Sequence, residues 1–131
     1  MRLLLDTHIA LWAILDDVRL GDKVRSLIAA PANAVVVSVA SILEITIKHA
    51  LARGRTGDVR IPGTQALGYF RDAGYEILAI MPEHAVEVGN LPDIHNDPFD
   101  RLLVAQANVE TLRLVTADRT VAAYDASIIL V

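Results

Sequence analysis

Short apolar runs alternate along the chain with segments in which apolar residues recur at helical spacing. The runs at residues 3–5 and 34–37 are continuous, and the second is rich in β-branched residues, so both predict parallel strands buried on two faces. Three more strands are predicted at residues 75–80, 112–116 and 127–131. The pattern therefore indicates a sheet of about five strands.

Between the strands, apolar residues spaced three and four apart predict helices. They cover residues 9–15, a segment that begins at 20–22, a segment from Ser38 or Ser41 to about Ala52, and residues 62–73, 82–88, 99–110 and 118–124. Residues 91–98 form a polar loop with two prolines. Because strands and helices alternate, we expect one α/β domain over residues 1–131, with a central parallel sheet between two helical layers (α/β/α).

Composition supports a single globular domain and excludes several kinds of site. The chain has 131 residues, of which 53% are hydrophobic and 21% are charged. It has no cysteine, which excludes disulfides and zinc–thiolate sites. No apolar run approaches the length of about 18 residues that a membrane helix needs. Asp6 stands where a signal peptide would need an apolar core, so we expect a cytoplasmic protein with no membrane association.

Acidic residues follow the strands or begin the helices of four separate elements. Asp6 ends the first strand, Glu44 lies early in the helix after the second, Asp100 begins the long helix, and Asp118 follows the fourth strand. In a parallel sheet these positions share one edge. Each acid also has a structural interpretation, because Asp6 and Asp118 can cap helices, Asp100 suits a helix dipole and Glu44 can pair with Lys48.

Four carboxylates at one edge repel one another, so together they favour a bound cation. Hard oxygen ligands without cysteine indicate Mg²⁺, or alternatively Mn²⁺, and such a site suits hydrolysis of a phosphodiester bond by a metal-activated water. The net charge of −4 argues against a nucleic-acid partner. Two considerations weaken that argument. Without the four site acids, 12 acids balance 12 basic residues, so the rest of the surface is near neutral. A bound metal would also reverse the negative field at the site.

Four segments of the sequence carry a resemblance to a known family. They are residues 3–8, 38–48, 91–107 and 114–118, and the most specific is Asp97-Pro98-Phe99-Asp100-Arg101-Leu102-Leu103. Over nearly its whole length the chain resembles the PIN-domain ribonucleases, and most closely the VapC-type toxins of prokaryotic toxin–antitoxin pairs. Two departures are Leu43, where such toxins often have tryptophan, and Arg53-Gly54-Arg55, where they often have a Gly-Lys-Leu type ending.

The resemblance implies roles for individual residues. Asp6, Glu44, Asp100 and Asp118 fall on the catalytic, metal-binding acids of the family, and Thr7 and Thr116 on hydroxyl positions beside the metal. Asp97 is expected to be a helix cap, with contact to the site through water as the alternative. Lys48 and Arg101 are the expected phosphate contacts. None of the four histidines is assigned a role, because they lack ligand spacing and an oxygen-rich site needs none.

The resemblance also implies a function. We expect an endoribonuclease that depends on Mg²⁺ or Mn²⁺, acts as the toxin of a type II toxin–antitoxin pair, and has RNA as substrate and a small antitoxin as partner. The apolar helices at residues 9–15 and 40–51, including Trp12, could bind an amphipathic helix of the antitoxin or a second copy in a homodimer. The alternative is a catalytically silent PIN module that binds protein or RNA, against which the four retained acids argue. A dinucleotide-binding domain is excluded because no glycine-rich turn follows the first strand.

Overall fold

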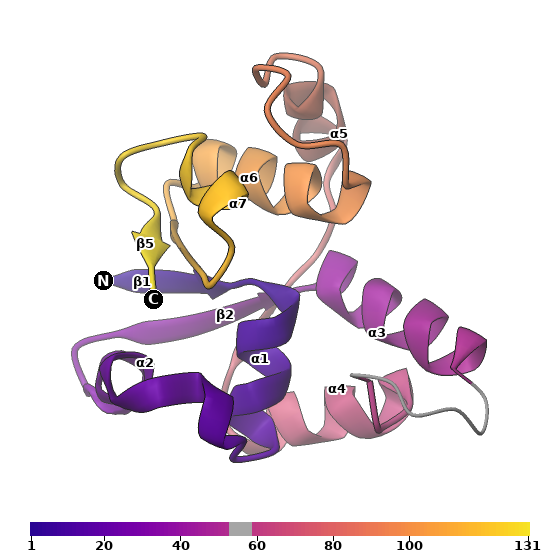
Figure 1. The fold of residues 1–131 in the computed structure, drawn as a ribbon, viewed down its shortest axis with the longest axis vertical. Coiled ribbons are helices and arrows are strands. Elements are labelled where there is room, and N and C mark those ends of the chain that lie inside the picture. Colours follow the sequence, from indigo (N-terminus) through magenta and orange to yellow (C-terminus); the bar gives the residue numbers. More distant parts are fainter. Residues whose placement is uncertain (53–58) are drawn as a thin grey trace.

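The protein folds as a central sheet between two layers of helices (Figure 1). The computed structural model describes residues 1–52 and 59–131. The strands are β1 (Arg2–Leu5), β2 (Ala34–Ser38), β3 (Glu76–Leu78), β4 (Arg113–Thr116) and β5 (Ile129–Leu130). The helices are α1 (Thr7–Ile14), α2 (Gly21–Ala29), α3 (Val39–Leu51), α4 (Gly63–Asp72), α5 (Pro82–Val88), α6 (Pro98–Glu110) and α7 (Arg119–Ala122), with a 3₁₀ turn, η1 (Val18–Leu20).

The five strands run parallel in the order β3-β2-β1-β4-β5. The first strand is therefore central, with Leu4 opposite Val36 of β2 and Leu114 of β4. This order reverses direction at β1, because the chain first builds the sheet toward β3 and later adds β4 and β5 on the other side. Ligand sites of open α/β sheets lie beyond the carboxyl ends of the strands at such a switch point.

Side chains of β1 point alternately into two separate cores. Leu3 and Leu5 pack with Ile9 of α1 and Phe70 of α4, whereas Leu4 packs with Leu103 of α6. Figure 1 shows the corresponding layers, with α1, α2 and α4 on one face of the sheet and α6 and α7 on the other. The predicted α/β/α fold with a five-stranded parallel sheet is confirmed.

Some predicted boundaries were wrong. The third strand was predicted over residues 75–80 but pairs with β2 only over Glu76–Leu78, and Ile80 is exposed on the way to α5. The last helix and strand are shorter than predicted, because a turn in which Asp125 Oδ1 accepts from the Ser127 amide lies between them. The 3₁₀ turn η1 was not predicted; the Asp17 side chain caps it.

The departure from the VapC-type pattern at Arg53-Gly54-Arg55 lies outside the described residues. Within residues 1–52 and 59–131, none of the helices has the length and hydropathy needed to span a bilayer.

The end of α6 provides a test of local backbone strain. Thr111 terminates this helix with φ +55° and ψ +47°, a left-handed conformation that is unfavourable for a β-branched residue. We expect Thr111→Gly to raise the free energy of unfolding by about 1 kcal/mol, since glycine adopts this conformation without strain. Urea denaturation of the two proteins measures the change. Thr111→Val, which keeps the β-branch, is the control and should give no gain.

Candidate active site

Asp6 lies where the central strand ends and α1 begins. Its Oδ1 accepts a hydrogen bond from the Ile9 amide (3.2 Å), so the predicted helix cap is confirmed. Its Oδ2 accepts a 2.5 Å hydrogen bond from the hydroxyl of Thr116, the last residue of the neighbouring strand β4. Asp6 is only 7% exposed. Asp6 can therefore cap α1 and also belong to a site, because the cap uses Oδ1 and the contact with Thr116 uses Oδ2.

Glu44 enters the same edge from α3. Ser38 caps this helix, accepting from the Ala40 amide (2.9 Å), and Glu44 follows in the second turn, where it is 3% exposed. The Thr7 hydroxyl donates to Glu44 Oε1 (2.6 Å), and Lys48 Nζ donates to Oε2 (2.5 Å). The predicted pairing of Glu44 with Lys48 is confirmed, but it is not an ordinary surface pair, because the Glu44 side chain is buried and only that of Lys48 reaches solvent.

The Asp-Pro-Phe-Asp segment forms the start of α6. Asp97 Oδ1 accepts from the amides of Phe99 (2.8 Å) and Asp100 (3.0 Å), which confirms its role as the cap. Pro98 occupies the first helical position, where its missing N–H costs nothing. Asp100 lies in the first turn, with its side chain 21% exposed. The motif thus fixes the backbone of Asp100 and leaves its carboxylate available.

Asp118 caps α7 immediately beyond β4. Its Oδ1 accepts from the Thr120 amide (2.8 Å), while its own amide donates to the Thr116 hydroxyl (3.0 Å). Thr116 therefore links the Asp6 carboxylate to the backbone of Asp118, since its hydroxyl also donates to Asp6 Oδ2. The second oxygen of Asp118 takes no part in the cap and faces the side chain of His95 at 3.5 Å.

His95 is a site residue that sequence reasoning missed. Its Nε2 lies 3.0 Å from Asp100 Oδ2 and 3.5 Å from Asp118 Oδ2. Single ligand atoms of these three residues lie within 4.8 Å of one another, a grouping that could hold a metal ion. Its Nδ1 accepts from the Asp97 amide (3.3 Å), which leaves Nε2 to face the acids. The available signal was its position in the loop that leads directly into the Asp97 cap.

Arg101 orders the loop that carries His95. Its guanidinium donates to the carbonyl oxygens of Val88 (3.0 Å) and Pro92 (3.1 Å) and to the Tyr124 hydroxyl (3.1 Å). That hydroxyl accepts in turn from the His95 amide (2.8 Å). Arg101 therefore has a structural role in addition to the phosphate contact expected of it. Lys48 stays a candidate for such a contact, with 44% of its side chain exposed.

Burial and neighbouring charge raise the pKa values of two of the acids, Asp6 and Asp100. Loss of hydration, together with the charges of Asp97, Asp6 and Glu44, raises the pKa of Asp100 to about 7. Burial also raises the pKa of Asp6, although hydrogen bonds from Thr116 and Ile9 oppose the change. Burial opposes the charge of Lys48, but its hydrogen bond to Glu44 and the nearby acids raise its pKa. A bound cation would relieve this accumulation of negative charge.

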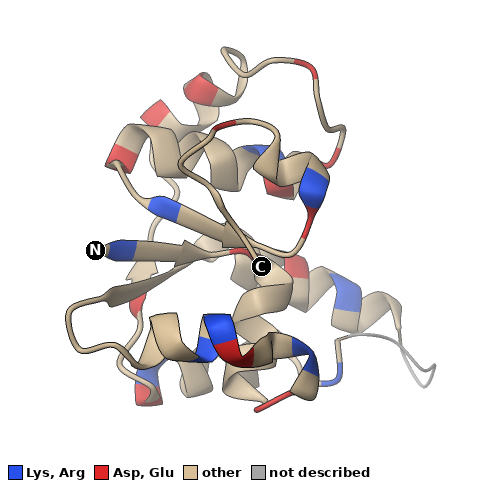
Figure 2. Cartoon of the chain, turned by 60° about the vertical axis from the view of Figure 1, so that its left-hand side comes forward, with Lys and Arg blue, Asp and Glu red and all other residues tan. Residues whose placement is uncertain are grey.

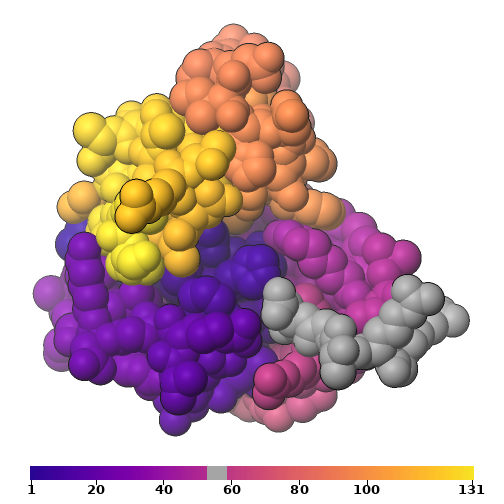
Figure 3. Space-filling view, in the orientation of Figure 1, coloured from indigo at the N-terminus to yellow at the C-terminus, as the bar shows by residue number. Residues whose placement is uncertain are grey.

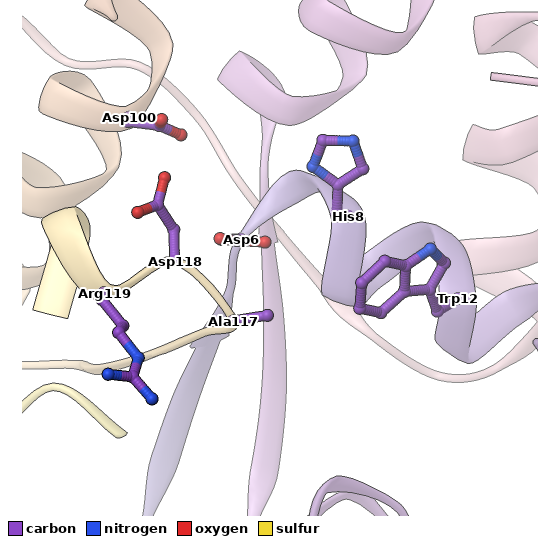
Figure 4. Close-up of a pocket in the computed structure, with 7 residues that line it drawn as sticks. All are labelled: Asp6, His8, Trp12, Asp100, Ala117, Asp118 and Arg119. Carbon is purple, nitrogen blue, oxygen red and sulfur yellow. The ribbon is translucent and has the colours of Figure 1, made fainter. Parts of the chain in front are cut away.

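Three of the acids, Asp6, Asp100 and Asp118, line a cavity of about 460 Å³. Figure 4 shows Asp6, Asp100 and Asp118 facing a common space, with His8 and Trp12 on one side and Arg119 on the other. Figure 2 shows acidic positions gathered where the central strands end. In Figure 3 the indigo N-terminal residues lie in a depression between the yellow C-terminal part and the magenta α3. The site is therefore open to a large substrate.

Comparison with known proteins places the chain in a family. The PIN domain family model matches residues 3–127, so the chain belongs to the PIN domain family. Members of this family are generally nucleases. No curated protein sequence matches the chain.

Solved structures share the fold at low sequence identity. VapBC2 from Rickettsia felis, bound to a DNA fragment from their promoter, has a chain with a TM-score of 0.69 and 18% identity, over 100% of this chain and 98% of that one. A chain of VapBC-1 from nontypeable Haemophilus influenzae has a TM-score of 0.62 and 17% identity, over 100% of this chain and 97% of that one. A chain of a toxin–antitoxin complex from Klebsiella pneumoniae has a TM-score of 0.59 and 20% identity, over 96% of this chain and 94% of that one.

Proposed function

We propose that this PIN domain is a metal-dependent endoribonuclease and the toxin component of a type II toxin–antitoxin pair. The observation that carries the proposal is the convergence of four acidic side chains, Asp6, Glu44, Asp100 and Asp118, at the carboxyl edge of the sheet. Three of them line one open cavity, and the pKa values of two are raised. Membership of a family of nucleases supports the same conclusion.

The donor set fits a hard divalent cation. Asp6, Glu44, Asp100 and Asp118 would hold Mg²⁺, with Mn²⁺ as the alternative, and His95 offers a nitrogen donor beside Asp100 and Asp118. When bound, such an ion lowers the pKa of a water and stabilises charge on the reacting phosphate. A cation also favours the ionised form of Asp100, whose proton it would displace at neutral pH.

The remaining site residues orient the acids. Thr116 holds Asp6 and the Asp118 backbone together, and Thr7 fixes one oxygen of Glu44. Lys48, which pairs with Glu44 and has 44% of its side chain exposed, would contact a phosphate oxygen of RNA. Asp97 contributes through its cap on α6 and through its charge, which helps to raise the pKa of Asp100.

The experiment that tests this function is cleavage of single-stranded RNA with analysis of the product ends. Hydrolysis by water yields a 5′-phosphate or a 3′-phosphate with a free hydroxyl on the other end. Attack by the ribose 2′-hydroxyl would instead yield a 2′,3′-cyclic phosphate, and would leave an all-deoxy substrate uncut. Cyclic ends would contradict a water nucleophile. Intact RNA under all metal conditions would favour a silent binding module.

An antitoxin partner is supported by the likeness to toxin–antitoxin complexes and by an apolar surface. Leu43, Ile47 and Leu51 lie four residues apart on α3 and are 46%, 40% and 76% exposed. Such a stripe can bind an amphipathic helix or a second copy of the chain. We propose a cytoplasmic homodimer that a small antitoxin inhibits.

Co-expression with the product of the neighbouring small open reading frame tests the partner. We expect a complex that co-purifies and has little ribonuclease activity, because a basic residue of the partner can pair with the acidic site. Substituting alanine for an arginine near the C-terminal end of the partner should restore part of the cleavage. A neighbour that neither binds nor restores growth would contradict the toxin assignment, while the nuclease assignment would stand.

A further inference from the structure

Trp12 is the only tryptophan of the chain, and it shares the cavity of the acidic residues. It lies four residues after His8 on α1, so the two rings occupy one face of the helix. Both rings line the cavity together with Asp6, Asp100 and Asp118 (Figure 4). The proposed function uses the acids and leaves the role of these rings unexplained.

The indole is held in place by contacts with its neighbours. The His8 and Trp12 ring centroids are 6.0 Å apart with an interplanar angle of 44°. The Arg19 guanidinium lies 5.1 Å from the indole centroid, and Asp17 holds that guanidinium (2.8 Å). Part of the indole packs against the core. The ring is therefore pre-oriented and need not be ordered when a ligand binds.

The cavity combines features that match a nucleotide. One side carries carboxylates that suit a phosphate-bound cation, with Arg119 next to Asp118, and the other side carries two aromatic rings. Its volume of about 460 Å³ is in the range of small-molecule sites. Bases of single-stranded RNA stack on aromatic side chains with little dependence on sequence. A base in a duplex is already stacked and is not available for such a contact.

An apolar protein anchor matches this cavity less well. Its lining includes Asp6, Asp100, Asp118 and Arg119, which an apolar side chain would desolvate without supplying partners. The exposed apolar stripe of α3 provides a separate surface for a partner helix.

We propose that Trp12 and His8 form a stacking surface for an unpaired base of RNA next to the phosphate that is cleaved. This inference rests on the proposed nuclease function and adds a preference for unpaired substrate. Trp12 would act in binding and positioning, and the acids in the chemical step.

Fluorescence of Trp12 reports the contact directly, since the full sequence contains no other tryptophan. The probe is an RNA of about ten nucleotides without secondary structure, added with Mg²⁺ to the Asp100→Asn variant so that it stays intact. We expect saturable quenching of the emission. The control probe is an abasic ribose-phosphate chain of equal length, which should not quench because it has no bases to stack.

Cleavage kinetics of Trp12 variants that retain Asp100 give an independent measurement. Trp12→Leu, which keeps an apolar side chain without an aromatic ring, should raise KM for unpaired RNA about tenfold, with a smaller change in kcat. Trp12→Phe should recover most of the loss, which a purely structural role of the indole would not require. Tyr69→Leu is the matched control, since Tyr69 is an exposed aromatic residue of α4 and should leave KM unchanged. Thermal melts confirm that each variant folds.

The outcomes separate this inference from the proposed function. If the protein cleaves RNA but quenching is absent and Trp12→Leu has the KM of the wild type, the stacking surface is wrong and the nuclease stands. If only the partner protein changes the emission, the rings serve protein docking and the proposal is also wrong. If wild type cleaves no RNA and RNA does not quench Trp12, the proposed function fails, and this inference with it.

Discussion

Replacing Asp100 by asparagine should lower the rate of RNA cleavage by about a hundred- to a thousandfold, the size of effect seen when one group that stabilises transition-state charge is removed. Asp100 lies in the first turn of α6, lines the cavity and faces His95 at 3.0 Å. Asparagine has nearly the same shape but no negative charge, so it is a poor ligand for a hard cation. Initial rates of cleavage of a labelled RNA, measured with excess Mg²⁺, give the comparison.

Two controls separate loss of the metal site from loss of the fold. Asp72→Asn makes the same chemical change on an exposed position of α4 and should retain full activity. Asp97→Asn keeps the cap of α6, since asparagine caps helices as well as aspartate does, and should retain most activity. We expect Asp6→Asn to be as inactive as Asp100→Asn, and Asp118→Asn to be less affected if its carboxylate serves only a second, weaker metal. A fully active Asp100→Asn protein would contradict the assignment of this site.

Asp100→Asn should also stabilise the metal-free protein. At about pH 8 the Asp100 carboxylate is charged in both the folded and the unfolded state, and burial and neighbouring acids disfavour that charge only in the folded one. A pKa of about 7 against the ordinary value of 3.8 sets an upper limit of roughly 4 kcal/mol, and solvent screening of the partly exposed Asp100 carboxylate makes the actual contribution smaller. We therefore expect Asp100→Asn to melt several degrees higher than wild type in EDTA. Asp6→Asn should change stability in the same direction by less, because it disturbs hydrogen bonds from Thr116 and Ile9.

The pH dependence of this gain follows from the direction of the pKa shift. As the pH falls from above 7 toward 4, folded Asp100 binds a proton that the unfolded carboxyl does not yet bind. The unfavourable contribution of Asp100 to wild-type stability is therefore complete above pH 7 and disappears toward pH 4. The difference in Tm between Asp100→Asn and wild type should be largest at about pH 8 and shrink at about pH 5.

Thermal melts of both proteins at the two pH values, each with EDTA and with Mg²⁺, measure these effects. Mg²⁺ should raise the Tm of wild type more than that of Asp100→Asn, because it binds the folded state of the intact site. Asp72→Asn should melt as wild type does under every condition. A lower Tm for Asp100→Asn than for wild type in EDTA at the higher pH would show that repulsion at the site is not the dominant effect.

The sheet and the positions of the acids could be predicted because local patterns determine them. The buried run Leu3-Leu4-Leu5 is long enough for one strand. Asp6, which follows that strand, can cap the next helix and still contribute a carboxylate oxygen to a site. Parallel topology then brings the carboxyl ends of β1, β2 and β4 together. The prediction that Asp97 is a cap held for the same reason, since both of its hydrogen bonds are to amides within three residues.

The role of the loop before α6 could not be predicted, because it depends on contacts between distant residues. His95 reaches Asp118 across 23 positions of the chain, and its backbone is held by Tyr124. Arg101 was expected to contact phosphate on the basis of its charge and nearness to Asp100; its hydrogen bonds to carbonyl oxygens of the loop are a second role that sequence reasoning did not anticipate. The end of β3 was misjudged because the apolar residues 79–81 favour a strand, while pairing with β2 stops at Leu78.

The most direct test of the central claim is cleavage of a single-stranded RNA by the purified wild-type protein as divalent metal is removed and returned. If Asp6, Glu44, Asp100 and Asp118 form a metal site for phosphodiester hydrolysis, cleavage should stop in excess EDTA and return when Mg²⁺ or Mn²⁺ is added beyond the chelator. The Asp100→Asn protein, purified in the same way, should stay inactive throughout, which excludes a contaminating ribonuclease. Undiminished cleavage by the wild type in excess EDTA would contradict the account.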